Sequence, residues 1–69
     1  MLKFDRFDPR AQALEVWRNA EQIVSDRWDA FLSSEPETRR WAFASYLAAL
    51  DAEEAAANEL ASFSLLVAA

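Results

Sequence analysis

The chain has 69 residues, of which 54% are hydrophobic, and it carries a formal net charge of −5. A domain of this length buries only about 60% of the surface that its unfolded chain exposes, so it commonly needs a further source of stability. Because the chain contains no Cys and no His, disulfides and the usual zinc sites are excluded, and oligomerisation is the expected source.

The distribution of charge and apolar residues disfavours export, membranes and nucleic acids. Charged residues interrupt the first ten positions, so we expect no export signal there, and no apolar run approaches the ~20 residues that cross a bilayer. The arginines are dispersed among acidic residues and the last part of the chain is acidic, which opposes binding to a phosphate backbone. We therefore predict a cytoplasmic protein without a membrane span or a nucleic-acid ligand.

The first helix is predicted to begin at Pro9 and to end near Leu32. Asp8 is a favoured N-cap residue, and proline is favoured at the first helical position because its missing N–H needs no partner there. Residues 1–7 are expected to form an N-terminal arm that packs near the end of the second helix.

Apolar residues form a wide stripe along this first helix. At helical spacing they cover an arc of roughly 200°, although one neighbouring helix covers only ~100°. A single partner helix is therefore not enough. The central stripe consists of Ala13, Leu14, Trp17, Ala20, Val24, Trp28, Phe31 and Leu32, and it is widened by Val16, Ile23 and Ala30.

The second helix is predicted to span about residues 35–66. Ser34 and Glu37 have the spacing of a capping box, in which each side chain accepts an N–H from the backbone of the other residue. The connection between the helices would then be two or three residues long, and so short a link favours an antiparallel arrangement. The fold class predicted for residues 1–69 is thus all-α, a single helical-hairpin domain.

Two apolar seams with coiled-coil spacing run along the second helix. We expect the first to pack against the first helix and the second to help bury a copy of the chain, so that two hairpins form a dimeric four-helix bundle. In this pairing Trp17 lies opposite Asp51 or Ala52, and Trp28 lies opposite Arg40 or Trp41. The Phe43 seam comprises Phe43, Leu47, Leu50, Glu54, Ala57 and Ala61, and the Tyr46 seam comprises Ala42, Tyr46, Ala49, Glu53, Ala56, Leu60, Phe63 and Val67.

Residues able to carry chemistry are sparse. Without His or Cys, a serine nucleophile has no base at a defined spacing, and no glycine-rich loop is available for phosphate. Glu53 and Glu54 interrupt the seams, but di-metal helical bundles use Glu-x-x-His pairs, which the chain lacks. We predict no enzyme, cofactor, metal site or small-molecule substrate. These glutamates are interpreted as solvated, with setting the register of packing or pairing with arginines across an interface as the alternative.

Two functions remain open. The first is a self-associating, non-enzymatic interaction module with a larger protein partner, and the second is a small regulator or inhibitor whose helix docks into a groove of its target. The apolar tail at 65–69 is interpreted as a packing element, with a partner site or a degradation signal as alternatives. Residues predicted to contact another protein are Arg39, Arg40 and Trp41, for which a surface salt-bridge cluster is the simpler interpretation, together with Tyr46, Leu60, Phe63 and Ile23.

Overall fold

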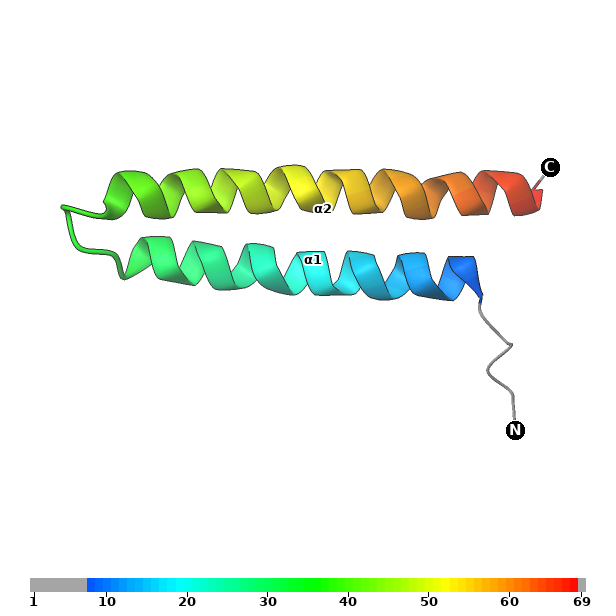
Figure 1. The fold of residues 1–69 in the computed structure, drawn as a ribbon, viewed down its shortest axis with the longest axis horizontal. Coiled ribbons are helices and arrows are strands. Elements are labelled where there is room, and N and C mark those ends of the chain that lie inside the picture. The colour runs from blue at the N-terminus through cyan, green and yellow to red at the C-terminus, as the bar shows by residue number, and fades with distance from the viewer. Residues whose placement is uncertain (1–7, 69) are drawn as a thin grey trace, which may run out of the picture.

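The protein is a hairpin of two long antiparallel helices. The computed structural model describes residues 8–68, with side chains for 8–63, and contains α1 (Pro9–Leu32) and α2 (Arg39–Ala68). Figure 1 shows the two helices side by side, joined by a turn at one end. The predicted all-α hairpin is confirmed, while the arm predicted at residues 1–7 lies outside the described residues. Over the described part of the chain, neither helix is apolar enough to cross a bilayer.

α1 begins at Pro9 with Asp8 as its N-cap, as the sequence predicted. The side chain of Asp8 accepts a hydrogen bond from the backbone N–H of Arg10 at 3.0 Å, and its carbonyl accepts the N–H of Gln12 at 3.0 Å. Pro9 occupies the first turn, where it has no donor to lose. These local contacts satisfy the first donors of the helix and determine where it begins.

The predicted capping box at Ser34 is wrong. The hydroxyl of Ser34 donates to the carbonyl of Phe31 at 2.8 Å, and that of Ser33 donates to the carbonyl of Asp29 at 3.0 Å. Both hydroxyls therefore bond to carbonyls at the C-terminal end of α1 that also accept the backbone N–H of the same serine, and neither caps α2.

The second helix begins at Arg39, four residues later than predicted. Proline disfavours a helical conformation in the residue before it, which keeps Glu35 out of the helix. Glu35 to Thr38 instead form a turn with Pro36 in its second position, closed by the Thr38 N–H to Glu35 carbonyl bond at 3.0 Å. The helical bonding pattern starts only when the Thr38 carbonyl accepts the N–H of Ala42 at 3.0 Å.

The seam of α2 that faces α1 is not the one that the sequence predicted. The Tyr46 seam faces α1, whereas Phe43 and Leu47 of the Phe43 seam are 43% and 45% exposed. Alanines at three positions of the Tyr46 seam allow the backbones to approach closely, which the larger side chains of the other seam would prevent. The line of contact consists of Ala13, Trp17, Ala20, Val24 and Phe31 on α1 and of Ala42, Tyr46, Ala49, Glu53, Ala56, Leu60 and Phe63 on α2.

The longer turn also shifts the pairing between the helices. Trp28 stacks against Tyr46, with ring centroids 5.0 Å apart, instead of lying opposite Arg40 or Trp41. Trp17 reaches Glu53 instead of Asp51 or Ala52. Each partner lies further along α2 than predicted, because residues 33–38 form the turn and push the start of the helix back.

The core of the hairpin is small. Among residues 8–63, only Ala13, Ala49 and Ala56 are buried, and no large side chain is fully covered. The Cα atoms extend 12 Å along the shortest axis of the molecule, which corresponds to a single layer of helices. Both faces of this layer are consequently open to solvent.

Candidate interaction surfaces

The hairpin has two faces, which are named here after one residue of each. In an antiparallel helix pair, positions one residue after the line of contact on either helix lie on the same face, and positions one residue before it lie on the other. The Phe43 face contains Leu14, Arg18, Glu21, Ser25, Trp28 and Leu32 of α1 and Phe43, Leu47, Leu50, Glu54, Ala57 and Ala61 of α2. The Trp41 face contains Pro9, Gln12, Val16, Asn19, Ile23 and Ala30 of α1 and Trp41, Ser45, Ala48, Ala52, Ala55, Glu59 and Ser62 of α2.

A cluster of four aromatic rings lies beside the turn and opens onto the Phe43 face. The ring centroids of Trp28 and Phe31, both on α1, are 5.4 Å apart. Those of Phe43 and Tyr46, both on α2, are 6.2 Å apart. Phe31 also contacts Phe43 across the helices at 5.4 Å. The cluster ties the two helices together, yet Trp28 and Phe43 remain exposed.

Leucines extend this exposed apolar surface. Leu32 follows Trp28 by one helical turn, and Leu47 follows Phe43 in the same way, so each leucine adjoins an exposed aromatic ring. Leu32 is the most exposed of these four side chains. Trp28, Leu32, Phe43 and Leu47 together form a contiguous patch, the turn patch, on the half of the Phe43 face nearest the turn.

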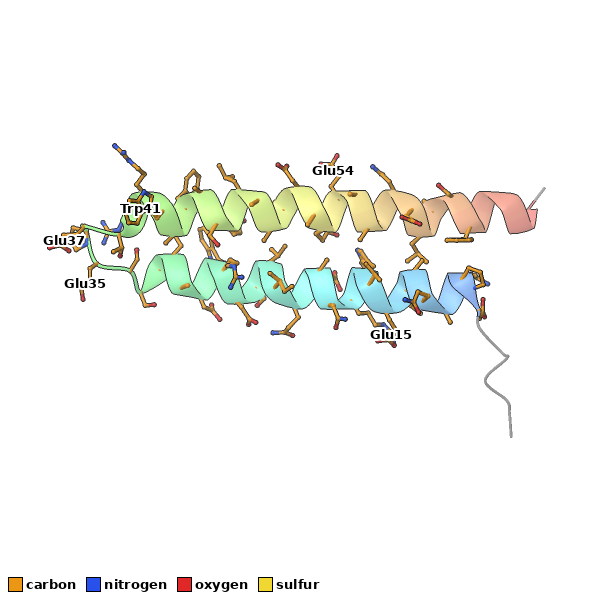
Figure 2. The ribbon with its side chains drawn as sticks, in the orientation of Figure 1. Glu15, Glu35, Glu37, Trp41 and Glu54 are labelled. Carbon is orange, nitrogen blue, oxygen red and sulfur yellow. The ribbon has the colours of Figure 1, made fainter. Side chains whose placement is uncertain are left out.

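Beyond the turn patch, the Phe43 face carries charged side chains near the middle of the hairpin. Arg18 and Glu21 of α1 line a shallow depression together with Glu53 of α2. Glu54 is exposed at the outer edge of the same region, and Figure 2 shows its side chain pointing away from α1. The Phe43 face therefore has the turn patch at one end and its charged side chains near the middle of the hairpin.

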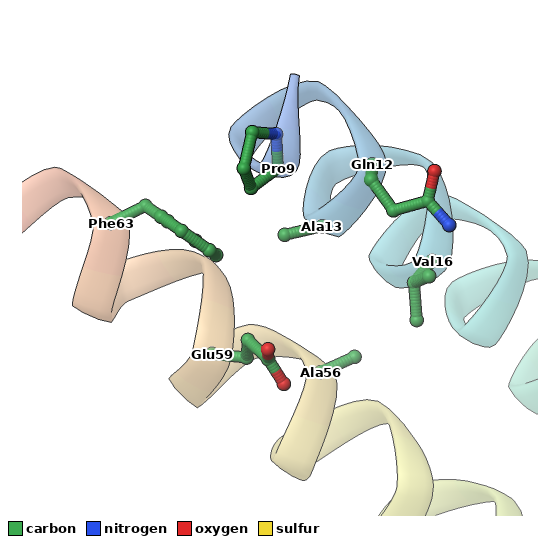
Figure 3. A pocket seen from close by; sticks show the side chains of 7 residues that line it. All are labelled: Pro9, Gln12, Ala13, Val16, Ala56, Glu59 and Phe63. Atoms are coloured by element: carbon green, nitrogen blue, oxygen red, sulfur yellow. The ribbon is translucent and has the colours of Figure 1, made fainter. Parts of the chain in front are cut away.

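The Trp41 face carries fewer large apolar groups, and these are spread along its length. Trp41, near the turn, is 71% exposed, and Ile23 and Val16 follow at increasing distance from the turn. At the open end a depression of about 200 Å³ lies between Val16, Phe63 and Glu59 (Figure 3). Alanines occupy most of the surface between these groups.

One polar contact links the helices midway along the hairpin. The indole N–H of Trp17 donates to a carboxylate oxygen of Glu53 at 2.8 Å, in a partly buried position. A hydrogen bond to a charged group is directional and shorter than a neutral one, so it fixes which residues lie opposite each other. This contact supports the interpretation that Glu53 sets the register of packing.

Glu53→Ala is expected to lower the free energy of unfolding by about 1 to 2 kcal/mol, because the partly buried indole N–H of Trp17 loses its acceptor. Urea denaturation followed by circular dichroism measures the change. Asp51→Ala, an exposed carboxylate on the same helix, is the matched control and should change stability by about 0.5 kcal/mol or less. Equal effects of the two substitutions would contradict a structural role for the contact.

The residues predicted to contact another protein fall into two groups. Arg39, Arg40, Trp41 and Ile23 are exposed, and the Arg39 guanidinium donates to the Ser34 carbonyl at 3.2 Å. The others, Tyr46, Leu60 and Phe63, are partly buried along the line of contact. Their participation in binding another protein stays a prediction.

The exposed turn patch was missed by the sequence prediction. Its four members were recognised as apolar, but they were assigned to the contact between the two helices of one chain. The surplus of apolar residues over what one helix can cover was the signal that some would be exposed. Periodicity alone did not identify which ones.

Comparisons of this chain with family models, with curated proteins and with solved structures find no match. Within residues 8–68, no group of three or more acidic side chains is arranged to hold a metal ion.

Proposed function

We propose that this protein is a non-enzymatic protein-interaction module that self-associates into a four-helix bundle and presents its remaining surface to a larger protein partner. The observation that carries the proposal is the amount of large apolar surface left open by the hairpin. Contiguous exposed apolar surface in a soluble protein usually marks a contact site. Seven large apolar side chains among the described residues are at least 40% exposed: Val16, Ile23, Trp28, Leu32, Trp41, Phe43 and Leu47.

The small core of the hairpin supports the same proposal. Burial of apolar surface is the main favourable term in folding, and a buried alanine contributes only one methyl group. The buried residues of the described hairpin are three alanines, while the larger side chains are covered only in part. A second hairpin packed on one face would cover the large side chains of that face and give the layered architecture of a helical bundle.

The chemical composition supports the non-enzymatic part of the proposal. A chain without His or Cys lacks the side chains most often used as a general base or as an activated nucleophile. A chain without Cys is also compatible with the reducing cytoplasm, which is the proposed location.

Size-exclusion chromatography with light scattering tests self-association. We expect a mass of two chains at micromolar concentration, and a thermal midpoint that rises with protein concentration because folding and assembly are linked. A cooperatively folded monomer whose thermal midpoint is independent of concentration would refute the proposal.

The exposure of Trp41 favours a second candidate function, that of a regulator whose helix docks into a groove of a target protein. Tryptophan and arginine are the residues most enriched at binding hot spots, and Arg40 precedes Trp41 in the chain. In this case the free protein would show a broad, weakly cooperative melt, which sharpens only when the target is added. A sharp, concentration-dependent melt of the protein alone would favour the bundle.

A further inference from the structure

We infer that the second copy packs on the Phe43 face, and that the turns of the two hairpins lie at the same end of the bundle. This inference rests on the proposed self-association, to which it adds the contact surface and the orientation.

The apolar groups of the Phe43 face are contiguous, and those of the Trp41 face are not. Trp28 and Phe43 are connected through the rings of Phe31 and Tyr46, and Leu32 and Leu47 adjoin them by one helical turn. On the Trp41 face, by contrast, the three exposed apolar side chains are separated by alanine and polar positions. A clustered apolar centre surrounded by a polar rim is the usual anatomy of a protein interface.

The area of the Phe43 face, compared with the area that a stable interface buries, shows how much of the face a second copy must cover. The 24 residues of α1 correspond to a length of about 36 Å, and two helices at the usual spacing are about 20 Å wide, so one face offers about 700 Å². A stable interface of standard size buries about 800 Å² on each partner. The turn patch by itself is too small, and the two copies must therefore overlap along their full length.

Full overlap leaves two orientations. If the turns lie at opposite ends, α2 of one copy lies over α2 of the other, and Glu54, at the midpoint of α2 (Arg39–Ala68), comes close to Glu54 of the other copy. Like charges facing each other disfavour this arrangement. If the turns lie at the same end, the turn patch of one copy packs on the turn patch of the other. The second arrangement places exposed aromatic and leucine side chains against each other and is the one that the side chains favour.

The charges of Arg18 and Glu54 also agree with the same-end orientation. A two-fold axis parallel to the helices places α1 of one copy over α2 of the other, at the same level along the bundle. The Trp17 to Glu53 hydrogen bond, at 2.8 Å, shows that these two residues share a level, and the next residues are Arg18 and Glu54. Arg18 of each copy then faces Glu54 of the other, which yields two complementary pairs at the rim. Such pairs select an orientation more than they strengthen binding.

Spin labels on the turn measure the orientation directly. The chain has no native Cys, so Glu35→Cys provides a single attachment point at the exposed turn (Figure 2). Pulsed electron paramagnetic resonance should give a distance between the two labels of about 25 Å or less for turns at the same end. Opposite ends would separate the labels by at least about 36 Å, the length of α1. A long distance in a dimer overturns the inference and leaves self-association intact.

Matched substitutions identify the face. Leu47→Glu on the Phe43 face is expected to weaken the dimer at least about tenfold, because a charge would enter an apolar contact. Ile23→Glu, at a similarly exposed position on the Trp41 face, should change the dissociation constant less than about twofold. The reverse ranking would overturn the choice of face. A native chain that is monomeric in the same experiment would refute the proposed function itself.

A mixture of two charge variants tests the facing pairs between chains. Arg18→Glu alone places like charges across the dimer, as Glu54→Arg alone does, so both homodimers should be weakened. Mixed together, the two variants restore opposite charges at both rim positions, and native mass spectrometry should detect more than the statistical half of dimers as heterodimers. A statistical mixture would overturn the assignment of Arg18 to Glu54, whatever the folding of any single variant.

Discussion

Trp17→Ala is expected to lower the free energy of unfolding by about 3 kcal/mol or more, the largest effect of any single truncation in the hairpin. The substitution removes a large side chain from the line of contact and leaves a cavity between the helices. It also removes the indole N–H that donates to Glu53 at 2.8 Å. Because the buried residues among positions 8–63 are three alanines, a loss of this size is a large fraction of total stability.

Urea denaturation followed by circular dichroism at one fixed protein concentration measures the loss. Trp41→Ala is the matched control, since it removes the same side chain from a position that is 71% exposed. It should change stability by about 0.5 kcal/mol or less. Denaturation midpoints that rank the two variants in the opposite order would show that the line of contact is assigned to the wrong side of α1.

Ala49→Asp should prevent the hairpin from forming a stable structure near neutral pH. Ala49 is 7% exposed and lies where the two helices approach closely, so an aspartate there has neither room nor a compensating charge. Placing an ionised carboxylate in such a position costs about 3 kcal/mol or more. The expected result is a loss of most helical signal at the concentrations where the native chain is folded.

Ala48→Asp is the control for helix propensity and net charge. It introduces the same side chain into the same helix, at an exposed position one residue away. The Ala48 variant should keep its helical circular dichroism spectrum, with only the small cost of aspartate within a helix. If both variants unfold, the loss is caused by aspartate in α2 itself and not by burial in the hairpin.

The sequence alone was sufficient for the helices and for the hairpin. Local interactions decide where α1 begins. The side chain of Asp8 accepts the N–H of Arg10, and Pro9 has no N–H that would need a partner in the first turn. The absence of glycine and the scarcity of proline leave one place for the chain to reverse. The surplus of apolar surface was also predictable, since the stripe on α1 is wider than one neighbouring helix can cover.

Only the tertiary structure decided which seam of α2 faces inward and which apolar residues remain exposed. The sequence allows Ser34 to bond at the end of α1 or at the start of α2, and in the structure its hydroxyl donates to the Phe31 carbonyl at 2.8 Å. That choice sets the length of the turn and hence the pairing of the helices. Both seams have the same spacing, so spacing does not decide which of them faces α1. The Tyr46 seam faces α1 because alanines such as Ala49 and Ala56 allow close approach and because Glu53 accepts the indole N–H of Trp17. These conditions become apparent only when both helices are in place.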